Sequence, residues 1–193
     1  MPLPDPAPRA LHQTRNITCA AYRREDGLWD IEGRVLDTHA FDFTTIWGRE
    51  VPEGTPMHEI WLRWTIGEDL TIREVAAAMD ATPYPPVCSN ALPAFQQLVG
   101  LTVGRGFTKE IRARIARSDG CTHLFTVIED MANITMRSVA AHVLTGTKNW
   151  GENAVTEATD RPPPLLNTCQ SYSAGSPVAK ILWPAFYTGP QES

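Results

Sequence analysis

The sequence lacks several features that would place it in a familiar class of proteins. No run of apolar residues approaches the roughly eighteen that a membrane-spanning helix needs, so we expect no membrane partner. Lysine and arginine number 17 against 22 aspartates and glutamates, a net charge of −5, and this acidic balance argues against a nucleic-acid-binding surface. Residues 1–8 lack the apolar centre of a signal peptide. Together these absences favour a cytoplasmic protein that binds a small molecule.

Close cysteine pairs and phosphate-binding motifs are missing too. The four cysteines are widely separated, with no Cys-x-x-Cys pair, and this spacing favours reduced thiols over a disulfide framework. The glycines of residues 101–107 form neither a G-x-G-x-x-G motif after a strand nor a G-x-x-x-x-G-K-[ST] loop. We therefore expect no nucleotide, and no organic cofactor is favoured.

The residues that are present suffice for one folded core. Hydrophobic residues make up 42% of the 193 residues, and the chain has 16 prolines and six tryptophans. We expect a single α+β domain over residues 15–187, with a disordered proline-rich lead (1–14) and a short tail (188–193). We also expect the protein to be a homo-oligomer.

Three stretches in the first half show the alternation of strands. Residues 17–22 and 28–36 flank the turn Asp26-Gly27, a combination that predicts a hairpin. In residues 57–66 every second position is apolar, and His58 begins that face. The other face of the second stretch is polar, with Asp30, Glu32 and Arg34.

Helical patterns dominate the second half. A capping-box pattern predicts a helix over residues 71–79, and shorter helices are expected over 92–99 and 108–117. The longest helical period covers residues 121–144. We expect an antiparallel sheet packed on this helix, with the other helices as shorter companions.

The stretches between and after these elements are expected to be irregular or extended. Residues 37–54 should form a loop and residues 145–164 a polar linker. Residues 165–169 and 178–183 resemble two short strands that would join the sheet.

Residues 120–124, Gly-Cys-Thr-His-Leu, begin the long helix. Cys121 and His123 would face unpaired backbone N–H groups and the positive end of the helix dipole. Such a position can lower a thiol pKa, bind an anion or present metal ligands. The alternative is that Cys121 is a small buried residue and His123 a capping side chain.

Several short blocks occur in an order typical of one bacterial family. They are YRR and DGLWDIEGR within residues 22–34, HEIWLR at 58–63, GCTHL at 120–124 and NTC at 167–169. The chain resembles, over about residues 15–185, a bacterial family whose domain has no assigned function. The resemblance implies a role in the catabolism of aromatic, lignin-derived compounds. The activity it suggests is that of a small cofactor-free lyase that releases formaldehyde from a hydroxymethyl side chain.

The first functional hypothesis is such a lyase acting by acid–base chemistry on a small aromatic substrate. The reaction needs a base for a hydroxyl proton and a group that manages the leaving charge. His58 is the first candidate for the base and His123 the second. Tyr84, Asp30 and Glu32 are further candidates for proton transfer. The substrate-binding candidates are cationic or aromatic: Arg34, Arg63, Trp61, Trp29 and Tyr22.

The second hypothesis is a metal-binding protein. Zinc accepts a set of three thiolates and one imidazole, and iron is the other metal considered. The candidate ligands are Cys88, Cys121, His123 and Cys169. Two further alternatives stay open, a Cys121 nucleophile activated by His123, and a non-catalytic binding protein.

Overall fold

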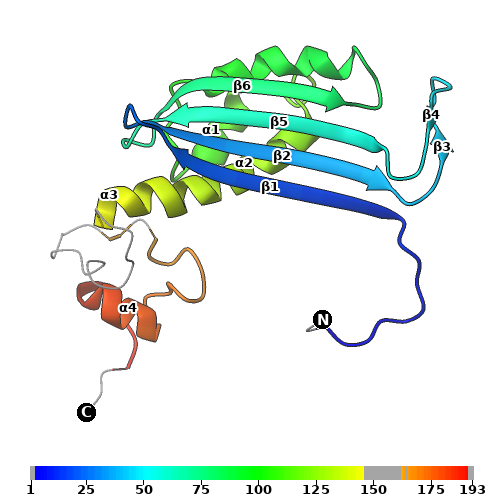
Figure 1. Ribbon diagram of the computed structural model, residues 1–193. Coiled ribbons are helices and arrows are strands. Elements are labelled where there is room, and N and C mark those ends of the chain that lie inside the picture. Colours follow the sequence, from blue (N-terminus) through cyan, green and yellow to red (C-terminus); the bar gives the residue numbers. More distant parts are fainter. Residues whose placement is uncertain (1–2, 146–161, 164, 191–193) are drawn as a thin grey trace. The chain divides into compact units, whose positions relative to one another are not determined.

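A four-stranded antiparallel sheet forms the centre of the first part of the chain (Figure 1). Its strands are β1 (Gln13–Arg23), β2 (Trp29–His39), β5 (Pro56–Ile66) and β6 (Ile72–Ala81), in the order β1-β2-β5-β6. The expected hairpin and third strand are therefore confirmed.

The computed structural model describes residues 3–145, 162–163 and 165–190. The chain divides into two compact units, residues 1–140 and 141–193. The domain expected over residues 15–187 spans both units and stays a prediction, and most of the polar linker expected over 145–164 lies outside the described residues.

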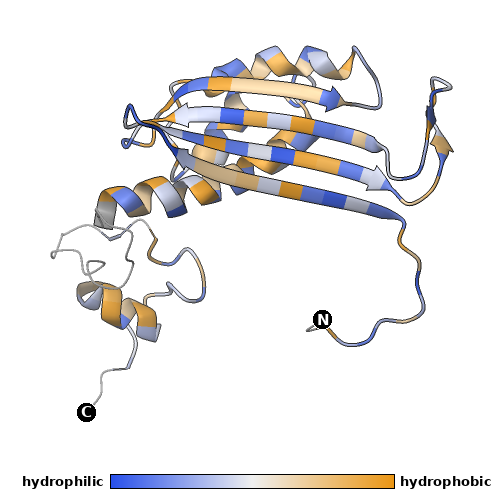
Figure 2. Ribbon diagram, in the orientation of Figure 1, coloured by the Kyte–Doolittle hydropathy of each residue, from blue (hydrophilic) through white to orange (hydrophobic). Residues whose placement is uncertain are grey.

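The sheet buries one face and leaves the other accessible. Along β2, Trp29, Ile31, Gly33, Val35 and Asp37 are buried, and every residue between them is only partly so. This alternation follows from the two-residue period of a strand and appears as alternating colours in Figure 2. The helices of the first unit lie against the buried face (Figure 1).

The long helix is present as expected. In the first unit it comprises α2 (Thr122–Thr135) and a turn of π-helix (η2, Met136–Ala140), and the second unit begins with α3 (Ala141–Thr145). α2 packs on β2, β1 and β5. A Cβ placed on Gly33 would lie 2.6 Å from Sδ of Met131 and 2.7 Å from Cγ2 of Val127. Only a glycine allows the helix to lie this close to β2.

Two shorter helices complete the core. The 3₁₀ helix η1 (Cys88–Leu98) packs beside β6, where Gln96 Nε2 donates to the Val75 carbonyl at 2.9 Å. α1 (Phe107–Arg114) supplies the buried residues Phe107 and Ile111. The fold class is α+β, with an antiparallel sheet on one long helix and several shorter ones.

The helix expected over residues 71–79 is wrong, because this segment is strand β6. The side chains of β6 alternate, with Val75, Ala77 and Met79 half-buried between exposed neighbours, and the strand pairs with β5. A turn also replaces the expected cap, since Asp69 Oδ1 accepts from the Thr71 N–H at 3.1 Å. Tertiary pairing here outweighs the helical preference of an alanine-rich segment.

The two strands expected near the C-terminus are also wrong. Residues 165–169 form turns, and residues 178–183 fall largely in helix α4 (Pro177–Leu182). Ser176 Oγ accepts from the Ala179 N–H at 3.0 Å, and Pro177 follows as the first helical residue. A serine cap followed by proline is a helix start, which explains the difference.

Between β2 and β5 the chain forms a small hairpin, β3 (Phe43–Thr44) and β4 (Glu50–Val51). The segment was expected to be a loop over residues 37–54, but β2 extends through His39. This extension adds Asp37 to the buried face of the sheet.

Candidate active site

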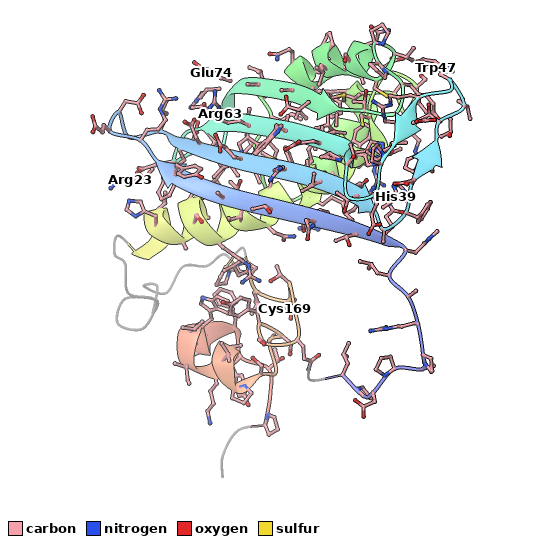
Figure 3. The ribbon with its side chains drawn as sticks, turned by 45° about the vertical axis from the view of Figure 1, so that its right-hand side comes forward. Arg23, His39, Trp47, Arg63, Glu74 and Cys169 are labelled. Atoms are coloured by element: carbon pink, nitrogen blue, oxygen red, sulfur yellow. The ribbon has the colours of Figure 1, made fainter. Side chains whose placement is uncertain are left out.

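Three polar side chains form a row across neighbouring strands on the helix-covered face. Arg15 of β1 is opposite Asp37 of β2, and Asp37 is opposite His58 of β5. The register of β2 and β5 shifts directly after Asp37, an irregularity that is frequent beside functional sites. The row lies near the end of the sheet where Figure 3 labels His39, opposite the end marked by Arg23.

Asp37 is a buried carboxylate held by a guanidinium group. Its side chain is 0% exposed, and Arg15 donates Nε to Oδ1 at 2.7 Å and Nη2 to Oδ2 at 2.6 Å. Burial alone would raise the pKa of this carboxyl, but the hydrogen bonds and charge of Arg15, helped by His58 and His123, hold it below its ordinary value. Asp37 is therefore an anion at neutral pH, with a bidentate cationic partner.

His58 lies beside this anion. Its Nδ1 is 3.0 Å from Oδ2 of Asp37 and makes no hydrogen bond of regular geometry, so the contact is primarily electrostatic. Burial lowers the pKa of His58 below its ordinary value although Asp37 acts in the opposite direction. The imidazole is thus neutral at neutral pH, and 17% of its side chain is exposed.

His123 approaches the same carboxylate from the first turn of α2. Its Nε2 is 3.6 Å from Oδ2 of Asp37, and its ring contacts that of His58 in a tilted arrangement, with centroids 3.9 Å apart and planes inclined by 32°. The pKa of His123 is lowered to about 4, mainly by burial; His58 and Arg15 act in the same direction, and Asp37 acts against them. Two neutral imidazoles, each partly exposed, therefore share one buried carboxylate.

Cys121 extends this cluster on the helix side. Its Sγ lies 3.7 Å from Nδ1 of His123, within hydrogen-bond reach for sulfur. The preceding Gly120 permits the turn into the helix, because a Cβ there would lie 2.6 Å from Cε2 of Phe125. The expected helix-start position of Cys121 and His123 is confirmed, with Cys121 as the N-cap residue.

The cluster also has the donors of a metal site. One ligand atom each from Asp37, His58 and His123 lies within 4.8 Å of the others. Two imidazole nitrogens and a carboxylate oxygen suit zinc or iron(II). Of the metal ligands expected from the sequence, only His123 belongs to this group; Cys88 begins η1, and Cys169 is in the second unit.

The polar candidates of β2 and β5 lie on the opposite face of the sheet from His58. Asp30 accepts from Thr65 Oγ1 at 2.6 Å, and Glu32 pairs with Arg63 at 3.4 Å. Figure 3 labels Arg63 and Glu74, which line this face. Arg34 forms an ion pair with Glu59, and its guanidinium lies 4.8 Å from the ring centroid of Trp61. These side chains lie on a separate surface and pair mainly with one another or with their neighbours on that face.

Two aromatic candidates, Tyr22 and Trp29, lie away from the row, and Tyr84 lies beside the β3–β4 hairpin. Tyr22 is 53% exposed and opposite Asp30, and Trp29 is buried at the far end of β2. Tyr84 contacts Trp47 of the β3–β4 hairpin edge to face, with ring centroids 5.3 Å apart. The structure therefore brings together His58 and His123, and not the other expected catalytic or substrate-binding residues.

Sequence reasoning missed Asp37 and Arg15. Asp37 is two residues beyond Val35 on the buried face, so continuing the alternation of β2 by one more pair would have found it. Arg15 is two residues before Ile17, just after the expected disordered lead. A charged residue that continues an apolar face at a strand end is the signal in both cases.

A family model matches residues 13–137, described as protein of unknown function (DUF2889). The chain belongs to this family. The matched segment includes all five members of the cluster, namely Arg15, Asp37, His58, Cys121 and His123. The family thus corresponds closely to the first unit, and its description gives no activity.

The other comparisons give no further assignment. No curated protein matches the chain, and no solved structure matches it. Among the described residues, no helix combines the length and apolar character needed to cross a bilayer.

Proposed function

We propose that this protein is a small enzyme whose reaction is general acid–base catalysis at His58, assisted by Asp37 and His123. The observation that carries the proposal is the wholly buried Asp37 carboxylate, 3.0 Å from Nδ1 of the partly exposed His58. A carboxylate at Nδ1 favours the tautomer with its proton there, which leaves Nε2 as the proton acceptor. A neutral imidazole at neutral pH is the form that a general base requires.

The reaction class we propose is a carbon–carbon lyase that releases formaldehyde from an aryl-substituted hydroxymethyl compound. His58 removes the hydroxyl proton, the carbon–carbon bond breaks, and its electron pair stays on the carbon beside the aromatic system. The proton then passes from His58 to that carbon, so the step needs no oxidant and no organic cofactor. The proposal places the protein in bacterial catabolism of lignin-derived aromatic compounds.

Aromatic side chains at the same end of the sheet support an aromatic substrate. His39, two residues after Asp37, contacts Phe43 edge to face with centroids 4.7 Å apart, and also contacts Phe41 at 5.4 Å. Flat apolar ligands are commonly bound among such rings. The wide spacing of the four cysteines in the sequence supports the cytoplasmic location that we propose. A homo-oligomer remains our prediction and can be checked by light scattering.

The test is formaldehyde release from a panel of aryl hydroxymethyl compounds by the purified protein. We expect activity that survives exhaustive chelation and falls at least about 100-fold in His58→Ala, the usual contribution of a general base. Arg63→Ala on the opposite face is the matched control and should retain activity. Equal activity of His58→Ala and Arg63→Ala would remove His58 from the mechanism.

Metal binding is the second candidate function, favoured by the convergence of Asp37, His58 and His123. A bound zinc or iron(II) ion would supply a Lewis acid at the same place, held by the two imidazoles and the carboxylate. Elemental analysis of the purified protein separates the two candidates. Stoichiometric metal that is lost in His58→Ala would support the metal centre and would contradict the base role of His58.

A further inference from the structure

The thiol of Cys121 is the one reactive group of the cluster that the proposed reaction does not use. It belongs to a continuous chain of contacts in which Cys121 Sγ lies 3.7 Å from Nδ1 of His123, and Nε2 of His123 lies 3.6 Å from Asp37. The two nitrogens of one imidazole thus face a thiol and a buried carboxylate. A nucleophile, a base and a group that orients the base stand in this order in enzymes that attack carbonyl carbon.

The position of Cys121 in its helix adds to this arrangement. Cys121 is the N-cap of the 14-residue helix α2, and its side chain makes no capping hydrogen bond. The first backbone N–H groups of a helix have no partner within the helix and stabilise negative charge nearby. Charge that develops on sulfur, or on an oxygen bound to the carbon that sulfur attacks, would be stabilised there.

We propose that Cys121 is a nucleophile that adds reversibly to the carbonyl carbon of a small aldehyde, with His123 accepting the thiol proton and Asp37 orienting His123. In this step a sulfur–carbon bond forms, and the π bond of the carbonyl breaks. The proton that leaves sulfur passes through His123 to the carbonyl oxygen. The product is a hemithioacetal, and reversal of the same steps releases the aldehyde without any co-reactant.

The aldehyde class rests on the proposed function, whose small product is formaldehyde, whereas the nucleophilicity of Cys121 rests on the contacts alone. A thiol beside His123, whose ring contacts His58, would hold the released aldehyde and keep it from recombining with the other product. In the lyase proposal, Cys121 would then be the residue that binds the second product, formaldehyde.

The other three cysteines provide internal controls in the same molecule. Cys88 is half-buried like Cys121, which makes it the matched control, and Cys169 is exposed. Burial and the charge of Asp130 raise the pKa of Cys19 to about 11, so this thiol should react slowest.

The experiment is alkylation of the native full-length protein with iodoacetamide at neutral pH, with each cysteine followed separately by peptide mass spectrometry. We expect Cys121 to react at least about tenfold faster than Cys88, as an activated thiol does. His123→Gln should bring Cys121 to the rate of Cys88, and Asp37→Asn should slow it by a smaller factor. Because the wild-type comparison needs no variant, a folding defect in either variant leaves the test intact.

Formaldehyde is the second probe in the same assay. It should slow alkylation of Cys121 reversibly and leave the rate at Cys88 unchanged. A Cys121 that reacts no faster than Cys88 would overturn the inference, as would a fast Cys121 that formaldehyde does not protect. Lyase activity is measured separately through His58→Ala, so failure here is distinguishable from failure of the proposed function.

Discussion

Asp37 contacts every other charged or titratable member of the cluster except the thiol, so it is the residue whose change would alter the site most. Arg15 contacts both of its oxygens, and the two histidines are 3.0 and 3.6 Å from Oδ2. Its charge is shared among three partners within a buried environment. Removal of that charge should therefore affect both stability and the titration of the histidines.

Asp37→Asn keeps the shape of the side chain and removes its charge. We expect a loss of about 2 kcal/mol in the free energy of unfolding, since a buried ion pair loses one partner while Arg15 stays partly solvated. The pKa of His58 should fall further, because Asp37 is the charge that raises it. Urea denaturation and NMR titration of the histidines measure the two effects.

Asp80→Asn is the control for this substitution. Asp80 is exposed and accepts a hydrogen bond from Trp61 Nε1 at 3.0 Å, so its loss should change stability by less than about 1 kcal/mol. Equal effects of the two substitutions would show that the buried charge of Asp37 has no special role.

The stability of the protein should fall as the pH is lowered from about 6.5 to about 4. His123 has a pKa of about 4 in the folded chain, against 6.5 as its ordinary value. In this interval the unfolded chain binds the proton and the folded chain does not, so acid favours unfolding, and the lowered pKa of His58 acts in the same direction. For His123 the loss amounts to at most about 3 kcal/mol.

At lower pH, Asp37 adds a second loss. Its pKa is depressed below 3.8, so its stabilising contribution is present above that value and declines as the pH falls through the folded pKa. Urea unfolding at a series of pH values measures the whole profile. His123→Gln should flatten the part between about pH 6.5 and about pH 4, and an unchanged slope there would contradict the assignment.

At the scale of elements, the contact between α2 and β2 depends on Gly33. Gly33→Ala would place a methyl group against Met131 and Val127 and should destabilise the fold by about 1–3 kcal/mol. Gly104→Ala is the matched control, since a Cβ there has nothing within 4 Å. Thermal or urea denaturation compares them, and equal stability of the two variants would mean that the helix adjusts without cost.

The sequence predicts correctly those elements in which the local residue pattern and the tertiary packing favour the same secondary structure. β2 and β5 alternate strongly, and α2 has a long helical period, so packing confirms what the pattern indicates. In β6 the two signals conflict: alanine favours a helix, while pairing with β5 requires a strand. Local pattern alone cannot resolve such a conflict.

The site could be predicted only in part for a related reason. His58 stood out because a histidine begins an apolar face, and His123 because it is at a helix start. Their common partner Asp37 is 21 residues before His58 in the sequence and is brought to it by strand register, as the pairing of β2 with β5 shows. The contact between Asp37 and His58 depends on the register of β2 and β5, and no short sequence motif indicates it.

At the scale of the whole molecule, the hydrophobic core belongs to the first unit. The buried core cluster extends from Trp29 to Val139, and its partly buried neighbours begin at Ile17. A chain of residues 1–145 should therefore fold with a cooperative unfolding transition and keep the alkylation rate of Cys121. Circular dichroism and the alkylation assay test this, and an unfolded fragment would show that the second unit is required for the fold.

Gly33 also has a geometric consequence for the site. It is four residues before Asp37 on the same strand face, a distance of about 13 Å, and the helix that rests on it carries His123 at its other end. The missing side chain sets the height at which α2 lies above the sheet, and therefore the gap between the imidazole of His123 and the carboxylate below it. A single methyl group at Gly33 would raise α2 from the sheet and so widen the cluster of Asp37, His58 and His123 without contacting any of the three.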